Sequence, residues 1–218
     1  MRLYVFLRPG RKASLSDMQW PAPHNGAPGA WIEAGRGVPP EAIRAYPTEE
    51  LLWCLDDELW EVELDGSLHR DGRAVVAKRG RLMRRVETWT SAVASELVEA
   101  CAFRARDAGV EALAGASLVS AANELRSCGS LDALEHVGST IAKRGSDAAA
   151  RLAGFAADTA LYAREAPDPV RAAAVAAYVA AHTLAGGDNS LAGYEARFAD
   201  ERRWQAEWLS RRLRLNTM

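Results

Sequence analysis

Residues 60–66 read Trp-Glu-Val-Glu-Leu-Asp-Gly, and this stretch decides the fold of the N-terminal part of the chain. Apolar and acidic side chains alternate with a period of two residues, which is typical of a strand that buries one face. Asp65-Gly66 is a strong turn signal, and residues 73–78 can supply the returning strand. We therefore expect Glu61 and Glu63 to lie on the solvated face of a β-ribbon.

The other segments before residue 80 also indicate strands and loops. Leu3–Leu7 is a short apolar run closed by Pro9 and Gly10. Prolines and glycines fill residues 21–40, which excludes a helix there and leaves room for a brief strand at residues 31–33. Residues 48–55 have the pattern of one or two helical turns. The N-terminal part is therefore expected to be rich in β-structure.

The period becomes helical near residue 82. Leu82, Val86, Trp89, Val93 and Leu97 recur every three or four residues, as on one face of a long helix, which Gly109 would end. Further capping and stop signals predict five more helices. These run from Val110 to about Leu125, from Ser130 to Gly145, from Ser146 through Leu152, Phe155, Thr159 and Tyr162, from Asp168-Pro169 to Gly186-Gly187, and from Asn189 or Ser190 to about residue 214.

These patterns together predict an α+β protein. A small β-rich unit is expected at residues 1–80, followed at residues 81–218 by an alanine-rich bundle of about six helices. Small alanine side chains let helix axes approach closely, and the short connections make sequential helices antiparallel neighbours.

Composition limits the class of protein. The 218 residues include 27 basic and 29 acidic side chains, for a formal net charge of −2, which gives no support to general binding of polyanions. Three widely spaced cysteines, Cys54, Cys101 and Cys128, form neither a disulfide framework nor a metal or redox pair. The run Leu3–Leu7 is too short for a secretory signal, and no stretch is apolar enough to span a membrane. We expect a cytoplasmic protein without a membrane partner.

Two parts of the chain resemble known families. Phe6-Leu7-Arg8-Pro9-Gly10, with residues 51–66, is similar to an uncharacterised domain of phage and bacterial proteins, over residues 1 to about 90. Members commonly carry Gly-x-His-x-Cys before the segment that matches residues 48–55. This chain has Ile-Arg-Ala-Tyr-Pro at residues 43–47, so any chemistry of that histidine and cysteine is absent. The helices around residues 194–209 resemble alanine-rich candidate immunity proteins. Neither resemblance implies an established reaction.

Acidic residues provide the candidates for catalysis. Asp56 and Asp57 precede the alternating strand, and carboxylates in a turn can share a hard cation. Glu61-Val62-Glu63 also resembles the Glu-x-Glu element of ADP-ribosyltransferases, in which case Arg8 would bind a phosphate. The alternative is that Glu61 and Glu63 only solvate a strand, as the alternation favours. The four histidines have no metal-ligand spacing, so we predict no metal and no cofactor.

Binding candidates lie elsewhere. Trp204 and Trp208 are four residues apart on the last helix and therefore share one face, either central in the bundle or exposed to a protein partner. The basic cluster Lys78, Arg79, Arg81, Arg84 and Arg85 is expected to form the wet side of the first helix, to pair with the acidic strand, or to contact nucleic acid, the last being disfavoured.

These residues contain no complete catalytic constellation. The sequence therefore favours a non-catalytic interaction protein, immunity-like or phage-related, that binds a macromolecular partner or a second copy through Trp204, Trp208, Arg84 and Arg85. The alternative is an enzyme that uses the carboxylates of Asp56, Asp57, Glu61 and Glu63 on a nucleotide-like or cationic molecule.

Overall fold

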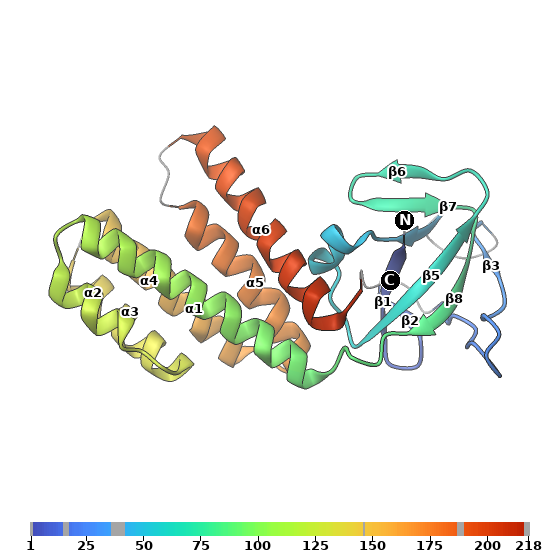
Figure 1. Ribbon diagram of the computed structural model, residues 1–218, viewed down its shortest axis with the longest axis horizontal. Coiled ribbons are helices and arrows are strands. Elements are labelled where there is room, and N and C mark those ends of the chain that lie inside the picture. The colour runs from blue at the N-terminus through green and yellow to red at the C-terminus, as the bar shows by residue number, and fades with distance from the viewer. Residues whose placement is uncertain (1, 15–17, 36–41, 146, 187–189, 216–218) are drawn as a thin grey trace. The chain divides into compact units, whose positions relative to one another are not determined.

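The protein has an α+β fold with two compact units (Figure 1). The computed structural model describes residues 2–14, 18–35, 42–145, 147–186 and 190–215. Unit 1 comprises residues 1–90 together with 206–218, and unit 2 comprises residues 91–205. The boundary expected at residue 80 falls after Thr90 instead, and the end of the chain returns to the first unit.

Unit 1 contains two antiparallel sheets. The larger has the strand order β2-β1-β5-β8-β3, and the smaller has the order β4-β7-β6. A 3₁₀ helix, η1 (Thr48–Trp53), occupies the expected short helical segment. The strands are β1 (Leu3–Arg8), β2 (Lys12–Ala13), β3 (Ile32–Glu33), β4 (Ile43–Ala45), β5 (Glu58–Asp65), β6 (His69–Asp71), β7 (Ala74–Ala77) and β8 (Arg79–Arg85).

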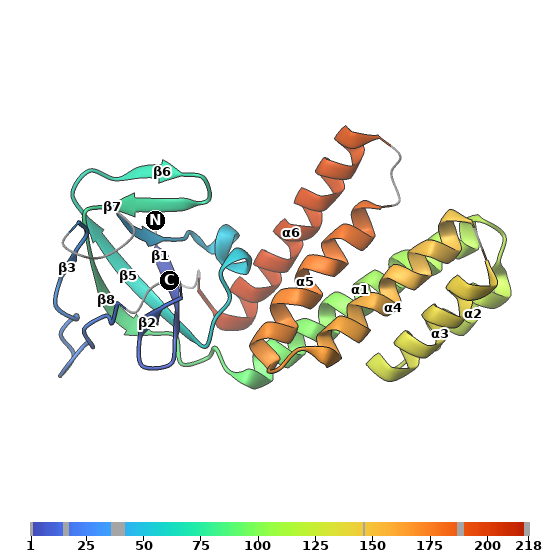
Figure 2. The same ribbon diagram turned by 180° about the vertical axis from the view of Figure 1, so that it is seen from behind.

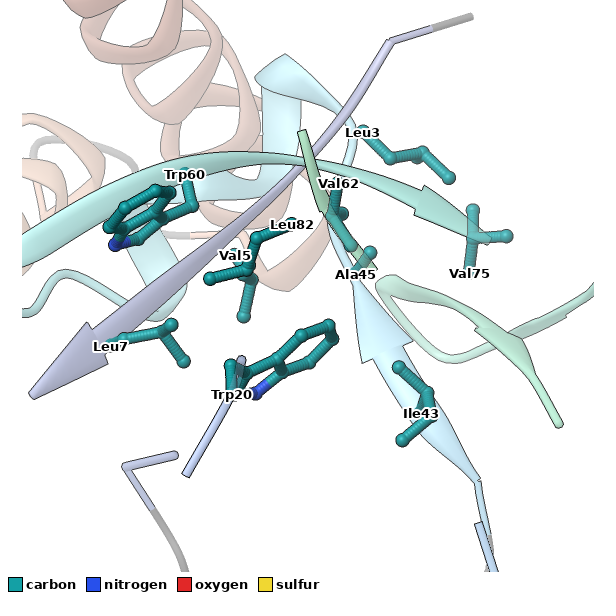
Figure 3. Packing of buried hydrophobic residues seen from close by; sticks show 10 residues of the cluster. All are labelled: Leu3, Val5, Leu7, Trp20, Ile43, Ala45, Trp60, Val62, Val75 and Leu82. Atoms are coloured by element: carbon teal, nitrogen blue, oxygen red, sulfur yellow. The ribbon is translucent and has the colours of Figure 1, made fainter. Parts of the chain in front are cut away.

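Strand β5 confirms the alternation expected from residues 60–66. Trp60 and Val62 are buried and point into a shared apolar core, which also contains side chains from β1, β4, β7 and β8 (Figure 3). Gly80 lies in this core, where an added Cβ would come within 2.8 Å of Ile43 Cγ2. Only glycine therefore lets β8 pass so close to the neighbouring side chains.

The opposite face of β1 and β5 is covered as well. Tyr4 is fully buried there, and the rings of Phe6 and Trp89 meet edge to face with centroids 5.4 Å apart. The end of the last helix contributes the carbonyl oxygen of Leu213, which accepts a hydrogen bond from Thr88, and the segment after it contributes that of Leu215, which accepts one from Tyr4. Residues 1–90 and 206–218 thus form unit 1 together.

The basic segment lies on a strand and not on a helix. Residues 79–85 form β8, which pairs antiparallel with β5, so the predicted start of the first helix at Leu82 was wrong, and that helix begins at Ser91. Two-residue alternation is present here too: Gly80 and Leu82 are buried between more exposed arginines. Pairing with an acid-rich strand favours the extended form, since opposite charges then face each other across the sheet.

Unit 2 is built from helices. The caps Ser130 and Asp168 agree with the prediction, whereas the fourth helix is capped by Asp147 and not by the expected Ser146. The side chains of Ser130, Asp147 and Asp168 each accept a hydrogen bond from a first-turn backbone N–H. The expected cap Ser146 lies outside the described residues, as do Gly187 and Asn189. The helices are α1 (Ser91–Gly115), α2 (Val119–Arg126), α3 (Leu131–Arg144), α4 (Ala148–Glu165), α5 (Pro169–Ala185) and α6 (Leu191–Leu213), the last of which continues into unit 1.

Gly109 does not end the first helix, as the sequence had suggested. It lies inside α1, where an added Cβ would come within 3.0 Å of Leu125 Cδ2 and 3.4 Å of Ala153 Cα. Gly109 is therefore a point of close approach between helices. The residues from Val110 to Leu113, expected in a second helix, continue the first.

Alanines form the buried faces of α4 and α5, in agreement with the close packing predicted. Gly138 on α3 lies so near α4 that an added Cβ would stand 2.6 Å from the carbonyl oxygen of Ala153. The larger side chains do not fit such an interface. Phe155 and Tyr162, which the sequence placed on this helix together with Leu152 and Thr159, are exposed.

Candidate functional site

The candidate carboxylates in unit 1 form hydrogen bonds or ion pairs with different side chains. Asp56 is almost buried: its Oδ2 accepts a 2.6 Å hydrogen bond from Ser14 Oγ, and its Oδ1 accepts one from the backbone N–H of Asp57. The backbone carbonyl of Asp56 accepts a hydrogen bond from the Trp89 indole. Asp56 thus anchors the turn before β5, and Asp57 is exposed beside it.

Glu61 and Glu63 lie in ion pairs across the sheet. Glu61 Oε2 is 2.6 Å from Arg84 Nε, and its Oε1 is 3.8 Å from Arg2 Nε. Glu63 Oε2 is 2.6 Å from Arg81 Nη2. The two glutamates therefore face arginines of neighbouring strands, as expected if the junction pairs with the acidic strand.

Arg8 contacts the neighbouring strand of the same sheet. Its Nη2 donates a hydrogen bond to the carbonyl oxygen of Ala13 on β2. Among the residues that the structure describes, no group of three or more histidine, cysteine, aspartate or glutamate side chains is placed to hold a metal ion.

The rest of the basic cluster also has partners within unit 1. The guanidinium groups of Arg79 and Arg81 lie over the Trp31 ring, 4.9 and 4.4 Å from its centroid, respectively. Arg79 also pairs with Asp65, and Arg85 lies 3.8 Å from Glu87. Stacking and ion pairing together hold this cationic strand against acidic and aromatic neighbours.

Trp204 and Trp208 lie on α6 and are both half-buried. They are therefore neither sealed in the centre of the bundle nor fully exposed to a partner. The guanidinium of Arg104 on α1 covers the Trp204 ring at 4.3 Å. The same Arg104 donates to Glu201, whose side chain is 1% exposed. Trp204 is thus part of the contact between α1 and α6.

This contact contains a buried polar network. Gln205 donates to the carbonyl oxygen of Ala177 on α5 and to Glu201, and it accepts a hydrogen bond from Arg202. Burial raises the pKa of Glu201, while Arg104 acts against that shift. Burial also raises the pKa of the Cys101 thiol beyond the physiological range, which makes this cysteine a poor nucleophile. The network holds three helices in register.

A ring cluster joins α5 to the first half of α6. His182 shares a hydrogen bond through Nδ1 with the Tyr194 hydroxyl, and its ring lies 4.8 Å from that of Phe198. Tyr178 meets His182 edge to face with centroids 4.3 Å apart. Burial and the positive charge of Arg202 lower the pKa of His182.

A group of exposed apolar side chains in unit 2 was missed by the sequence reasoning. Phe155 and Tyr162 on α4 are 45% and 47% exposed, and Val175 and Tyr178 on α5 are 36% and 49% exposed. The opposite, alanine-rich sides of both helices are buried and pack with α1, which lies behind α4 and α5 in Figure 2. We call these four residues the aromatic face. The sequence could have indicated this face, because these four large side chains stand among alanines at helical spacing.

Comparison with family models, with curated proteins and with solved structures found no match to this chain. Both resemblances noted in the sequence therefore remain hypotheses. None of the described helices is long and apolar enough to cross a membrane.

Proposed function

We propose that this chain is a non-catalytic interaction protein that binds a macromolecular partner through the aromatic face. The observation that carries the proposal is the exposure of Phe155, Tyr162 and Tyr178, three aromatic rings with nearly half of each surface open to solvent on two adjacent helices. Tyrosine and other large aromatic side chains are enriched where proteins bind one another, and they often dominate the binding energy.

The structural scaffold of this face supports the same function. Helices α4 and α5 pack through alanines, and the Thr183 hydroxyl lies between the carbonyl oxygens of Val179 on α5 and Phe155 on α4, at 2.9 and 3.3 Å. A rigid face loses little conformational entropy when a partner binds. The resemblance of the C-terminal helices to candidate immunity proteins also favours a protein partner.

The alternative of a carboxylate enzyme finds less support in the same structure. Two of its proposed acids already have partners within the fold, since Asp56 bonds to Ser14 and Glu61 pairs with Arg84. A strand of alternating ion pairs stabilises a sheet, and this role accounts for Glu61 and Glu63 without a substrate.

Site-specific photo-crosslinking tests the proposed function. A photoreactive phenylalanine analogue replaces Tyr162 or Tyr178, the modified chain is irradiated in cells, and covalent adducts are separated by mass. The matched control carries the same analogue at Val119, which lies on α2 and is 59% exposed. We expect discrete adducts from Tyr162 and Tyr178 that the Val119 position does not give. Equal or absent adducts at all three positions would overturn the proposal.

A further inference from the structure

Helix α4 carries a solvent-facing stripe that is complementary to itself. Its members follow the helical repeat, and the half-buried Asp158 is the central one. Basic charge lies toward the N-terminal end of the stripe and acidic charge at its C-terminal end, with one aromatic ring on each side of the centre. In order, the stripe reads Arg151, Phe155, Asp158, Tyr162 and Glu165.

The spacing of this stripe is symmetric. Arg151 and Glu165 each lie seven residues from Asp158, which is about 10.5 Å along a helix axis. Phe155 and Tyr162 lie about 4.5 and 6 Å from it on opposite sides. An antiparallel copy of α4 placed over the first would therefore set each Arg151 opposite a Glu165 and each Phe155 opposite a Tyr162.

We propose that the partner of this face is a second copy of the chain, bound through an antiparallel, two-fold contact between the two α4 helices. This inference rests on the proposed function and names its partner. In such an isologous contact each favourable pair occurs twice. The two end pairs supply opposite charges, and the rings supply the apolar centre. Val175 and Tyr178 flank this contact on α5.

The same geometry places the two Asp158 carboxylates closest to the two-fold axis. Like charges in that position repel each other and oppose association. The two chains therefore bind more weakly than they would through the rings and the end pairs without this repulsion. Replacing Asp158 with asparagine removes the repulsion at nearly constant shape. We therefore expect Asp158→Asn to strengthen self-association by about tenfold, a gain that a purely adventitious surface contact does not predict.

Charge reversals at the two ends of the stripe give the decisive test, because the proposed contact specifies which reversal should compensate for which. Arg151→Glu and Glu165→Arg each replace both attractive end pairs with repulsive ones, so each variant alone should sediment as a monomer where the unmodified chain forms dimers. Mixed in equal amounts, the two variants restore both pairs and should form a heterodimer. The double variant Arg151→Glu/Glu165→Arg should again form homodimers.

Two control variants carry the same charge changes elsewhere. Glu111→Arg on α1 and Arg126→Glu on α2 alter exposed residues outside the stripe, and they should leave sedimentation unchanged, alone or mixed. Circular dichroism establishes that each variant is folded. A chain that stays monomeric at high micromolar concentration, or a mixture that does not associate, overturns the two-copy contact. Crosslinks from Tyr162 to a different macromolecule would then leave the proposed function standing, whereas the absence of such crosslinks would remove both.

Discussion

The hydroxyl of Tyr4 donates a hydrogen bond of 3.1 Å to the carbonyl oxygen of Leu215, although 211 residues separate the two in sequence. Tyr4 is fully buried, and burial is the largest of the effects that raise its pKa. Arg2 donates a longer hydrogen bond, of 3.4 Å, to the same oxygen. Strand β1 is thus joined directly to the segment that follows α6.

Replacing Tyr4 with phenylalanine tests this connection. We expect the free energy of unfolding of unit 1 to fall by about 1–2 kcal/mol, because a buried carbonyl loses its best donor while the ring still fills the core. Urea denaturation, monitored by tryptophan fluorescence, measures this change in the free energy of unfolding. The control Ser67→Ala removes an exposed hydroxyl from unit 1 and should change stability by less than about 0.5 kcal/mol. Equal effects of the two substitutions would show that the bond to Leu215 contributes nothing.

The pairing of Glu61 with Arg84 is testable by a double-mutant cycle. The variants Glu61→Gln and Arg84→Gln and the double variant isolate the interaction energy, which we expect to be about 0.2–1 kcal/mol for a cross-strand ion pair. Arg84 is largely exposed, so added salt should reduce this energy. A coupling energy of zero, or one indifferent to salt, would contradict a stabilising role for the pair.

Much of unit 1 was predictable from its alternation, and the part that was not has a physical cause. Around Trp60 the pattern of apolar and acidic residues is unambiguous. Around Leu82 the spacing to Val86 fits a helix, yet the segment forms a strand. Long-range pairing decides the outcome, since Arg81 and Arg84 face Glu63 and Glu61 across the sheet. A local period contains no information about such a partner.

Close packing at Gly138 leads to a prediction about unit 2. Gly138→Ala should lower the free energy of unfolding by about 1–3 kcal/mol, because the added methyl group would press on the carbonyl oxygen of Ala153. Gly115 at the end of α1 is the matched control, as no heavy atom lies within 4 Å of the place that an added Cβ would take. Gly115→Ala should be neutral or stabilising through helix propensity. Thermal unfolding measures both, and a neutral Gly138→Ala would refute the close approach.

The helical unit shows a second limit of sequence reasoning. Helix caps at Ser130 and Asp168 were predicted because they depend on neighbouring backbone groups only. Gly109 was misjudged as a stop, because a glycine that ends a helix and one that admits a neighbouring helix look alike in sequence. The exposure of Phe155 was not predictable either, because hydrophobicity alone does not reveal that alanines already fill the interface.

The ring cluster around His182 predicts a dependence of stability on pH. Burial and Arg202 lower the pKa of His182 in the folded chain, so the unfolded chain takes up the proton at higher pH. The stabilising contribution is present above the ordinary histidine pKa of 6.5 and is lost as the pH falls through the folded-state pKa. Tyr178 and Tyr194 face the same ring.

We expect the melting temperature of the unmodified chain to fall between about pH 7.5 and pH 5.5, and to fall less in His182→Gln. The control His136→Gln, which replaces an exposed histidine on α3, should follow the unmodified chain. Identical pH profiles for all three proteins would exclude His182 as the titrating group.

The candidate site was less predictable than the fold. Trp204 was selected because its spacing from Trp208 defines a helix face, but the stacking of Arg104 on that ring depends on a residue 100 positions away. Exposure, likewise, is a property of packed neighbours. The rings of Phe155 and Tyr178 became candidates only once their surroundings were known.

The return of the chain to unit 1 has a consequence for biosynthesis. A ribosome delivers β1 first, but the residues that shield its Tyr4 side emerge only after unit 2 has been translated. The nascent helical insert can therefore acquire its tertiary contacts while the earlier sheet is still only partly covered. During this delay the apolar side of the sheet stays open to intermolecular contacts, which favour aggregation.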